Sequence, residues 1–306
     1  MIGAMGDHSR RAWLMVLALV LALGCAGPQV AQQAPAPPPV ATVQKPPAPE
    51  VAASDLLNAV LWMQRSVEYK ANALTAFALA RIRLDQALED RNWTAAPKEQ
   101  AGAYQALPPA IVLDVDESIL DNSGYQAWMT LKGTSFDSKT WNAYVNTVTS
   151  QPIPGAVEFA NYAASKGVKV FYVSNRTAEE EPATRKNLEK FGFPMGGAVD
   201  TMLMTKKQPD WGSAKGTRRA FIAGSYRILI NVGDNFGDFV DEYRGTEAER
   251  LKVMEEHKAR WGREWIMIAN PSYGSFESAP YRHDFKLSDD EKRKLKRAVL
   301  DAWPGP

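Results

Sequence analysis

The segment Ala110-Ile-Val-Leu-Asp-Val-Asp-Glu-Ser118 carries the strongest signal for both the fold and the chemistry of this chain. It opens with four apolar residues, two of them β-branched, which is the pattern of a buried strand. Asp114 ends the run and Asp116 follows two residues later, so their carboxylates should emerge close together. Like charges so close raise each other's proton affinity unless a cation compensates, and oxygen ligands favour Mg²⁺ over zinc. An isolated Asp-x-Asp also occurs in turns and helix caps, so this interpretation depends on the neighbouring segments.

Further apolar runs of this kind alternate with helical patterns downstream. The runs span 168–173, 199–204 and 226–232, and the helical patterns lie around 156–166, 180–191 and 214–224. Alternating strands and helices predict an α/β fold with a parallel sheet and right-handed crossovers. In such sheets the functional residues collect beyond the carboxyl ends of the strands.

Ser174-Asn175-Arg176 follow the second apolar run. A hydroxyl and free backbone N–H groups at a strand end suit a tetrahedral anion such as phosphate. Taken alone, the same residues are equally compatible with the N-cap of a helix.

Gly233-Asp-Asn-Phe-Gly-Asp238 follows the last run and adds two carboxylates, Asp234 and Asp238. The glycines relieve the turn, and the carboxylates would face the first Asp pair. The alternative is a capped turn that leads into a helix containing Phe239 and Val240.

Lys215 lies in Gly212-Ser-Ala-Lys-Gly216, with Arg218 and Arg219 close behind it. A cation can neutralise charge on a transferring phosphoryl group. A single lysine is more often a solvated surface residue, so its assignment depends on the other segments.

Together these segments occur in a fixed order: Asp-x-Asp, Ser, Lys, then Gly-Asp-x-x-x-Asp. This order resembles the haloacid dehalogenase-like (HAD) superfamily, and longer matches resemble its bacterial class C acid phosphatases. Those matches lie at 61–64, 68–70, 116–123, 172–176, 233–239 and 270–277, so the resemblance covers about residues 54–285. Ser118 stands where this family usually has Thr, and both residues supply a hydroxyl. The resemblance implies an α/β parallel sheet flanked by helices, with a smaller, mainly helical cap.

The resemblance also implies a role for each matched residue. Asp114 would attack phosphorus to form an aspartyl-phosphate, and Asp116 would protonate the leaving group and then activate water. The phosphoryl oxygens would be bound by Ser174, Asn175 and Lys215. Mg²⁺ would be held by Asp114, the backbone carbonyl of Asp116 and Asp234, with Asp238 behind them or bound through water.

Substrate choice would rest on aromatic residues. By the resemblance, Trp141 and Tyr273 are placed to stack on a nucleobase or nicotinamide ring, which implies a 5′-nucleotidase acting on nucleoside or nicotinamide mononucleotides. The alternative is that both are packing residues, because the chain has nine Trp and ten Tyr. A homodimer is a further expectation from the family.

The first residues have the order of a bacterial export signal: Arg10-Arg11, the apolar run 13–23, then Gly24-Cys25. The run is too short to cross a bilayer core of about 30 Å as a helix. We therefore expect residues 1–24 to be a signal peptide and Cys25 to be lipidated, although a lone Cys can also be a small buried hydrophobe. The Pro- and Ala-rich stretch 25–53 would tether the phosphatase domain, 54–306, to an outer membrane or cell-surface face.

That domain should combine the α/β core with a cap formed by the N-terminal helical region, 55–90, and insertions. The helical region is either one long helix or two in sequence. A capping box at 288–291 should open a last helix, and its basic cluster should be a solvated face.

Composition excludes several functions. The formal net charge is +1, so a nucleic-acid partner is not expected. One Cys and three His leave no thiolate cluster and no pair of His at metal-ligand spacing. Two alternatives to a nucleotidase stay open: a broad phosphatase of sugar or aryl phosphates, and a non-catalytic lipoprotein that binds haem or a host ligand. A binding lipoprotein has no need for Asp114, Asp116, Lys215 and Asp234 together.

Overall fold

The computed structural model describes residues 54–305. The predicted signal peptide, Cys25 and the tether lie outside this range. The described residues belong to one compact unit.

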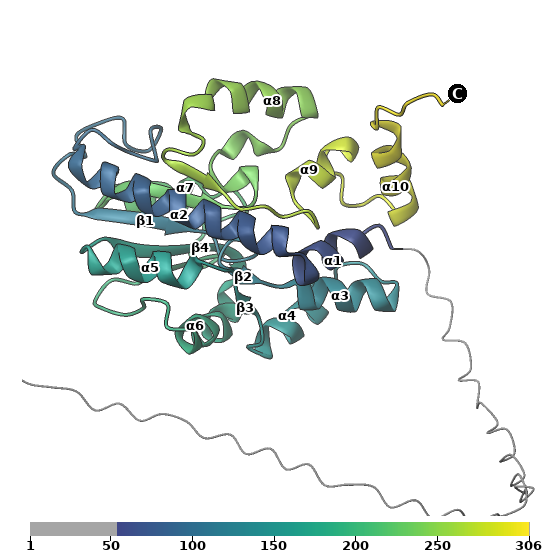
Figure 1. Ribbon diagram of the computed structural model, residues 1–306, viewed down its shortest axis with the longest axis horizontal. Coiled ribbons are helices and arrows are strands. Elements are labelled where there is room, and N and C mark those ends of the chain that lie inside the picture. The colour runs from purple at the N-terminus through teal and green to yellow at the C-terminus, as the bar shows by residue number, and fades with distance from the viewer. Residues whose placement is uncertain (1–53, 306) are drawn as a thin grey trace, which may run out of the picture. The chain divides into compact units, whose positions relative to one another are not determined.

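A five-stranded parallel sheet forms the centre of the molecule (Figure 1). Its order is β5 (Met202–Thr205), β4 (Lys169–Thr177), β1 (Pro109–Leu113), β6 (Arg227–Gly233) and β7 (Trp265–Met267). The α/β prediction is confirmed, and the strand after which Asp114 follows is the central one. Because β4 and β6 flank β1, the residues that follow these three strands meet at one edge of the sheet.

Helices cover both faces and the ends of this sheet. They are α1 (Leu57–Arg65), α2 (Val67–Glu89), α3 (Ser123–Lys132), α4 (Ser138–Asn146), α5 (Ala156–Ser165), α6 (Glu181–Lys190), α7 (Gly216–Ala223), α8 (Glu247–Glu256), α9 (Ser275–Ser278) and α10 (Asp289–Ala298). Short 3₁₀ turns lie at 178–180, 236–238, 241–243, 258–260 and 279–281. Among residues 54–305, no helix combines the length and the apolar character that a membrane crossing requires.

Alternate residues of the strands build a hydrophobic core on each face. Ile111 and Leu113 pack with residues of α2 and α5, which lie side by side over the sheet in Figure 1. Ala110 and Val112 point the other way and pack with residues of α7. A parallel strand buried on both faces is apolar throughout, which is why 110–113 was recognisable in the sequence.

The N-terminal helical region is two helices, not one. Ser66 has an extended backbone (φ −78°, ψ 146°) and its hydroxyl accepts from the backbone N–H of Tyr69 at 3.0 Å. Ser66 therefore ends α1 and caps α2.

The cap was expected from the N-terminal helical region, 55–90, together with insertions, and the segment after β1 is one such insertion. It contains α3, α4 and a short antiparallel pair, β2 (Leu120–Asp121) and β3 (Gln151–Pro152). The Gln64 side chain on α1 donates to the carbonyl of Ser123 at 3.0 Å, which fastens α1 to α3.

Two boundaries differ from expectation. β4 continues to Thr177, which pairs with Thr205 after a register shift, so Ser174 lies within the strand and not after it. The capped turn of the alternative is present, because Asn235 caps the 3₁₀ turn at 236–238, but Phe239 and Val240 follow that turn and are not in a helix.

Candidate active site

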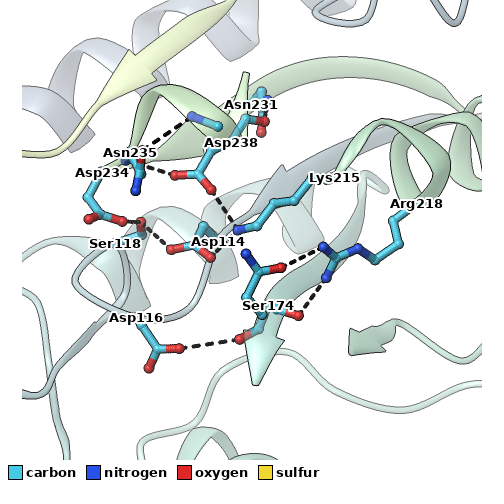
Figure 2. Close-up of polar contacts among 12 residues, drawn as sticks. Asp114, Asp116, Ser118, Ser174, Lys215, Arg218, Asn231, Asp234, Asn235 and Asp238 are labelled. Atoms are coloured by element: carbon cyan, nitrogen blue, oxygen red, sulfur yellow. Dashed lines mark hydrogen bonds and ion pairs between the residues drawn. The ribbon is translucent and has the colours of Figure 1, made fainter. Parts of the chain in front are cut away.

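Three predicted carboxylates meet at the carboxyl edge of the sheet (Figure 2). Asp114 follows β1, Asp234 follows β6, and Asp238 ends the 3₁₀ turn at 236–238. Each offers one carboxylate oxygen, and these oxygens lie within 4.8 Å of one another. Asp114 and Asp238 are buried, and Asp234 is partly exposed.

The local sequence forces Asp238 back toward the sheet. Its carboxylate accepts from the backbone N–H of Asn235 at 2.9 Å, and its carbonyl accepts from the Asn231 side chain at 2.9 Å. A Cβ at position 233 would lie 2.3 Å from the Asp238 carboxylate. Gly233 is therefore required by the close approach of that side chain.

Lys215 lies between two of these carboxylates. Its ammonium contacts Asp114 Oδ1 and lies 2.6 Å from Asp238 Oδ1. Its side chain is only 4% exposed, so the alternative of a solvated surface lysine is wrong. The adjacent Gly216 N–H donates to Asp241 at 2.9 Å, which fixes the start of α7 and with it Lys215. We call Asp114, Lys215, Asp234 and Asp238 the carboxylate–lysine cluster.

Ser118 and Asn270 join the cluster through hydrogen bonds. The Ser118 hydroxyl lies 2.7 Å from Asp114 Oδ2 and 3.0 Å from Asp234 Oδ1. The Asn270 amide donates to Asp234 Oδ2 at 2.8 Å. The hydroxyl that Ser118 shares with Thr is thus in contact with two of the carboxylates.

Burial and mutual repulsion disfavour charge on the carboxylates. Burial raises the pKa of Asp114 even though Lys215 opposes this. Burial, followed by the charges of Asp238 and Asp114, raises the pKa of Asp234 well above its usual range. Burial alone would lower the pKa of Lys215, but Asp114 and Asp238 outweigh it and raise that pKa.

This electrostatic excess fits a divalent cation. The ammonium of Lys215 pairs with Asp114 and Asp238 but not with Asp234, so the three carboxylates carry uncompensated negative charge when all are ionised. A second cation with oxygen ligands would remove the cost of ionising them. The donor set therefore fits a divalent metal site formed by Asp114, Asp234 and Asp238.

The Asp116 carboxylate faces away from this cluster and toward β4 (Figure 2). Its Oδ1 accepts from Arg176 Nε at 2.9 Å and from the Asn122 amide at 2.9 Å, and its Oδ2 lies 3.3 Å from the Ser174 hydroxyl. Metal binding by the side chain of Asp116 has no support in this arrangement, whereas binding through its backbone carbonyl stays a prediction.

Glu117 lies beside Asp116 in a left-handed backbone conformation (φ 57°) and is fully buried. It accepts from the backbone N–H of Asn122 at 2.8 Å and from the Tyr273 hydroxyl. Burial raises the pKa of Glu117 to about 8. We call Asp116, Glu117, Asn122, Ser174 and Arg176 the Asp116 network.

The predicted phosphate-binding residues differ in their surroundings. The Ser174 hydroxyl accepts from the backbone N–H of Arg176 at 3.0 Å. The next 3₁₀ turn is capped by Thr177 and not by Ser174, so the N-cap alternative is wrong. The Asn175 amide donates to the Ser213 carbonyl at 3.0 Å and accepts from Arg218 at 2.6 Å. Its side chain holds the loop before Lys215, and a phosphate contact by Asn175 stays a prediction.

The two predicted ring-stacking residues approach Asp116 through different partners. Trp141 is half-buried among Tyr125, Phe136 and Tyr144, with ring centroids 5.2–6.2 Å away. The Arg176 guanidinium lies 5.4 Å from the centroid of the Trp141 ring. Tyr273 is also partly exposed and reaches the network through its bond to Glu117.

Sequence reasoning assigned no role to several residues that shape the site. They are Glu117, Asn122, Arg176, Arg218 and Asn270. Arg218 is fully buried, and its guanidinium donates to the Ser174 carbonyl at 2.6 Å. For Arg176 the available signal was an arginine three residues after the apolar run 168–173, because arginine is almost never fully buried unless it is paired.

Comparisons with known proteins agree with this geometry. A family model described as HAD superfamily, subfamily IIIB (Acid phosphatase), matches residues 21–276. Two crystal structures of the class C acid phosphatase from Bacillus anthracis, one with tungstate bound, are similar to this chain. Each is 33% identical with a TM-score of 0.71, and the match covers 81% of this chain and 97% of theirs.

More distant relatives come from Glycine max. The Stem 28 kDa glycoprotein and a Stem 31 kDa glycoprotein are each 25% identical over 146 residues, which is 46% of this chain. The match spans 56% and 49% of those proteins, so the chain covers about half the length of these curated relatives.

Proposed function

The chain belongs to the acid phosphatases of HAD subfamily IIIB, and from this premise we propose that it is a Mg²⁺-dependent 5′-nucleotidase that hydrolyses phosphomonoesters through an aspartyl-phosphate. The observation that carries the proposal is the carboxylate–lysine cluster, with Asp116 two residues from Asp114. A binding protein has no need for this set of buried charges at one edge of the sheet.

Asp114 is the nucleophile in this proposal. Its carboxylate is held by Lys215 and by Ser118 at 2.7 Å, so its direction of attack is fixed. An oriented carboxylate gains several kcal/mol or more from positioning, in order-of-magnitude terms. Lys215 also neutralises charge on the phosphoryl oxygens as the bond to the leaving group breaks. Asp114, Asp234 and Asp238 would hold Mg²⁺, which would supply further positive charge to the transferring phosphoryl group.

Asp116 serves both chemical steps. It gives a proton to the leaving alkoxide as Asp114 attacks, and it takes a proton from water when the aspartyl-phosphate is hydrolysed. Its carboxylate points away from the cluster, and its Oδ2, with the Ser174 hydroxyl 3.3 Å away, is the oxygen available for proton transfer.

A mononucleotide is the favoured substrate. Trp141 and Tyr273 both reach the Asp116 network, so a base or nicotinamide ring stacked on either would lie on the leaving-group side of the phosphate. Stacking of this kind is worth about 1–3 kcal/mol per base. One observation favours the second candidate, a broad phosphatase of sugar or aryl phosphates: Trp141 already packs against three neighbouring rings.

The proposal extends to location and assembly. A lipid on Cys25 and the Pro- and Ala-rich tether would hold the domain at a membrane surface, with a homodimer as the expected assembly. Growth with a labelled fatty acid would test the first, because a Cys25→Ser variant should take up no label. Light scattering of the purified protein would test the second.

The deciding experiment is phosphate release from nicotinamide mononucleotide, adenosine monophosphate and a sugar phosphate, with Mg²⁺ and with chelator. We expect release that needs the metal and is fastest on the mononucleotides. Equal rates on all three substrates would favour the broad phosphatase. No release by the folded wild-type protein would reject the enzymatic proposal in favour of a binding lipoprotein.

A further inference from the structure

Arg176 is a buried arginine at the carboxyl end of β4, and its side chain is 1% exposed. Its Nε and one terminal nitrogen lie 2.9 Å and 2.8 Å from the same oxygen, Asp116 Oδ1. The remaining donors are fixed by Thr184 Oγ1 at 3.0 Å and Asn122 Oδ1 at 3.1 Å. The guanidinium is therefore held on several sides and cannot follow a moving carboxylate.

The two oxygens of Asp116 have unequal surroundings. Oδ1 accepts hydrogen bonds from Arg176 Nε and from the Asn122 amide, each at 2.9 Å, and a terminal nitrogen of Arg176 forms an ion pair with the same oxygen at 2.8 Å. Oδ2 has the Ser174 hydroxyl at 3.3 Å as its contact, and the Asp116 side chain keeps 17% exposure. A proton carried by this carboxyl group belongs on Oδ2, because Oδ1 already accepts several N–H donors.

We propose that Arg176 is a positioning residue that locks Asp116 through Oδ1, so that Oδ2 is the atom that delivers the proton to the leaving group. This inference rests on the proposed phosphatase chemistry and adds to it the residue that orients the acid. Among the described residues, Arg176 forms no hydrogen bond or ion pair with a side chain of the carboxylate–lysine cluster, so it acts through Asp116.

The chemistry balances at each step. In the first step an Asp114 oxygen forms a bond to phosphorus, the bond from phosphorus to the ester oxygen breaks, and the Asp116 Oδ2 proton moves to that oxygen. In the second step a water oxygen bonds to phosphorus, its proton moves to Asp116 Oδ2, and the bond from Asp114 to phosphorus breaks. Phosphate leaves, and both carboxyl groups return to their starting states.

Lysine cannot replace this arginine. Arg176 donates from Nε to Asp116 Oδ1 and from its two terminal nitrogens to Thr184 and Asn122, whereas lysine offers a single flexible ammonium. Arg176→Lys thus keeps the positive charge and removes the orientation, which separates the two effects.

The test uses aryl phosphates that differ in how much their leaving group needs a proton. Phenyl phosphate has a basic leaving group that needs the acid, while 2,4-dinitrophenyl phosphate has one that departs as the anion. We expect Arg176→Lys to lower kcat/KM about 10²-fold on phenyl phosphate and less than about 5-fold on 2,4-dinitrophenyl phosphate. Asp116→Asn should show the same selectivity, and Asp116→Asn combined with Arg176→Lys should be no worse than Asp116→Asn alone.

Controls separate positioning from general damage. Arg227→Lys alters another buried arginine, at the start of β6 and therefore at the opposite end of the sheet, and should affect both substrates equally. Arg176→Gln is a second variant in case the lysine variant does not fold, and melting temperatures show which proteins are intact. An equal loss on both substrates in the Arg176 variants, with selectivity kept in Asp116→Asn, would overturn this inference. If Asp116→Asn itself lacks selectivity, the proposed role of Asp116 fails instead.

Discussion

The carboxylate–lysine cluster and the Asp116 network lie side by side but are built in different ways. Asp114 and Asp234 stand directly after β1 and β6, so the sheet places them and the backbone leaves them little freedom. Asp116 is placed by side chains from the loop after β1, from β4 and, through Glu117, from the segment around Tyr273. The carboxylate–lysine cluster suits groups that must stay fixed. The Asp116 network suits a group that must keep one orientation in two successive chemical steps.

This difference predicts that substitutions in the carboxylate–lysine cluster lower the activity most. Asp114→Asn removes the nucleophile while keeping the size of the side chain, and we expect kcat to fall at least about 10⁴-fold on every phosphomonoester. Because burial raises the pKa of Asp114, the metal-free variant should be at least as stable as the wild type. Steady-state kinetics and thermal melting check both expectations. Full activity in a folded Asp114→Asn protein would end the aspartyl-phosphate mechanism.

Lys215→Met tests whether the cluster is held together by its one ammonium. Removing this partner leaves Asp114 and Asp238 buried without compensation, which typically costs about 3–5 kcal/mol of stability. The rate should fall about 10²–10³-fold, because one preorganised charge is lost from the phosphoryl oxygens. Melting with Mg²⁺ and with chelator makes the test sharper: a bound cation should stabilise this variant more than it stabilises the wild type. Equal stabilisation of the two proteins would show that Lys215 and the metal do not share the cluster.

The same contrast explains what the sequence could predict. Asp114, Asp234 and the order of the strands were predictable because a buried parallel strand followed by a carboxylate is a local pattern. The Asp116 network was not, since Arg176 and Asn122 are 54 residues apart and meet only when β4 lies beside β1. The later end of β4 and the missing helix at Phe239 have similar causes. Thr177 stays in β4 because it finds a pairing partner in Thr205, and the helix after Asp238 is absent because the chain turns to fold that carboxylate onto Gly233.

Trp141→Ala tests whether Trp141, which lies next to the Asp116 network, stacks on the base of the substrate. If Trp141 stacks on the base, KM for adenosine monophosphate should rise about 5- to 100-fold, while KM for a sugar phosphate should change little. Phe136→Ala is the matched control, because Phe136 packs in the same aromatic cluster but is 63% exposed. A similar rise for both substrates in Trp141→Ala would make Trp141 a packing residue and favour the broad phosphatase.

Glu117→Gln gives the smallest expected effect and probes the network through pH. Burial raises the pKa of Glu117 to about 8 in the folded protein, above the value of 4.5 that we take for the unfolded chain. The folded state therefore binds this proton more tightly, so the stability linked to Glu117 is complete below pH 4.5 and is lost as the pH rises toward 8. Metal-free wild type should lose at least about 1 kcal/mol of stability from this group between pH 5 and 8. In Glu117→Gln that part of the slope should disappear, because the amide resembles the protonated acid at every pH. Urea unfolding across this range measures the slope directly, and identical slopes in the two proteins would mean that the contacts with Asn122 and Tyr273 keep Glu117 ionised in the folded state.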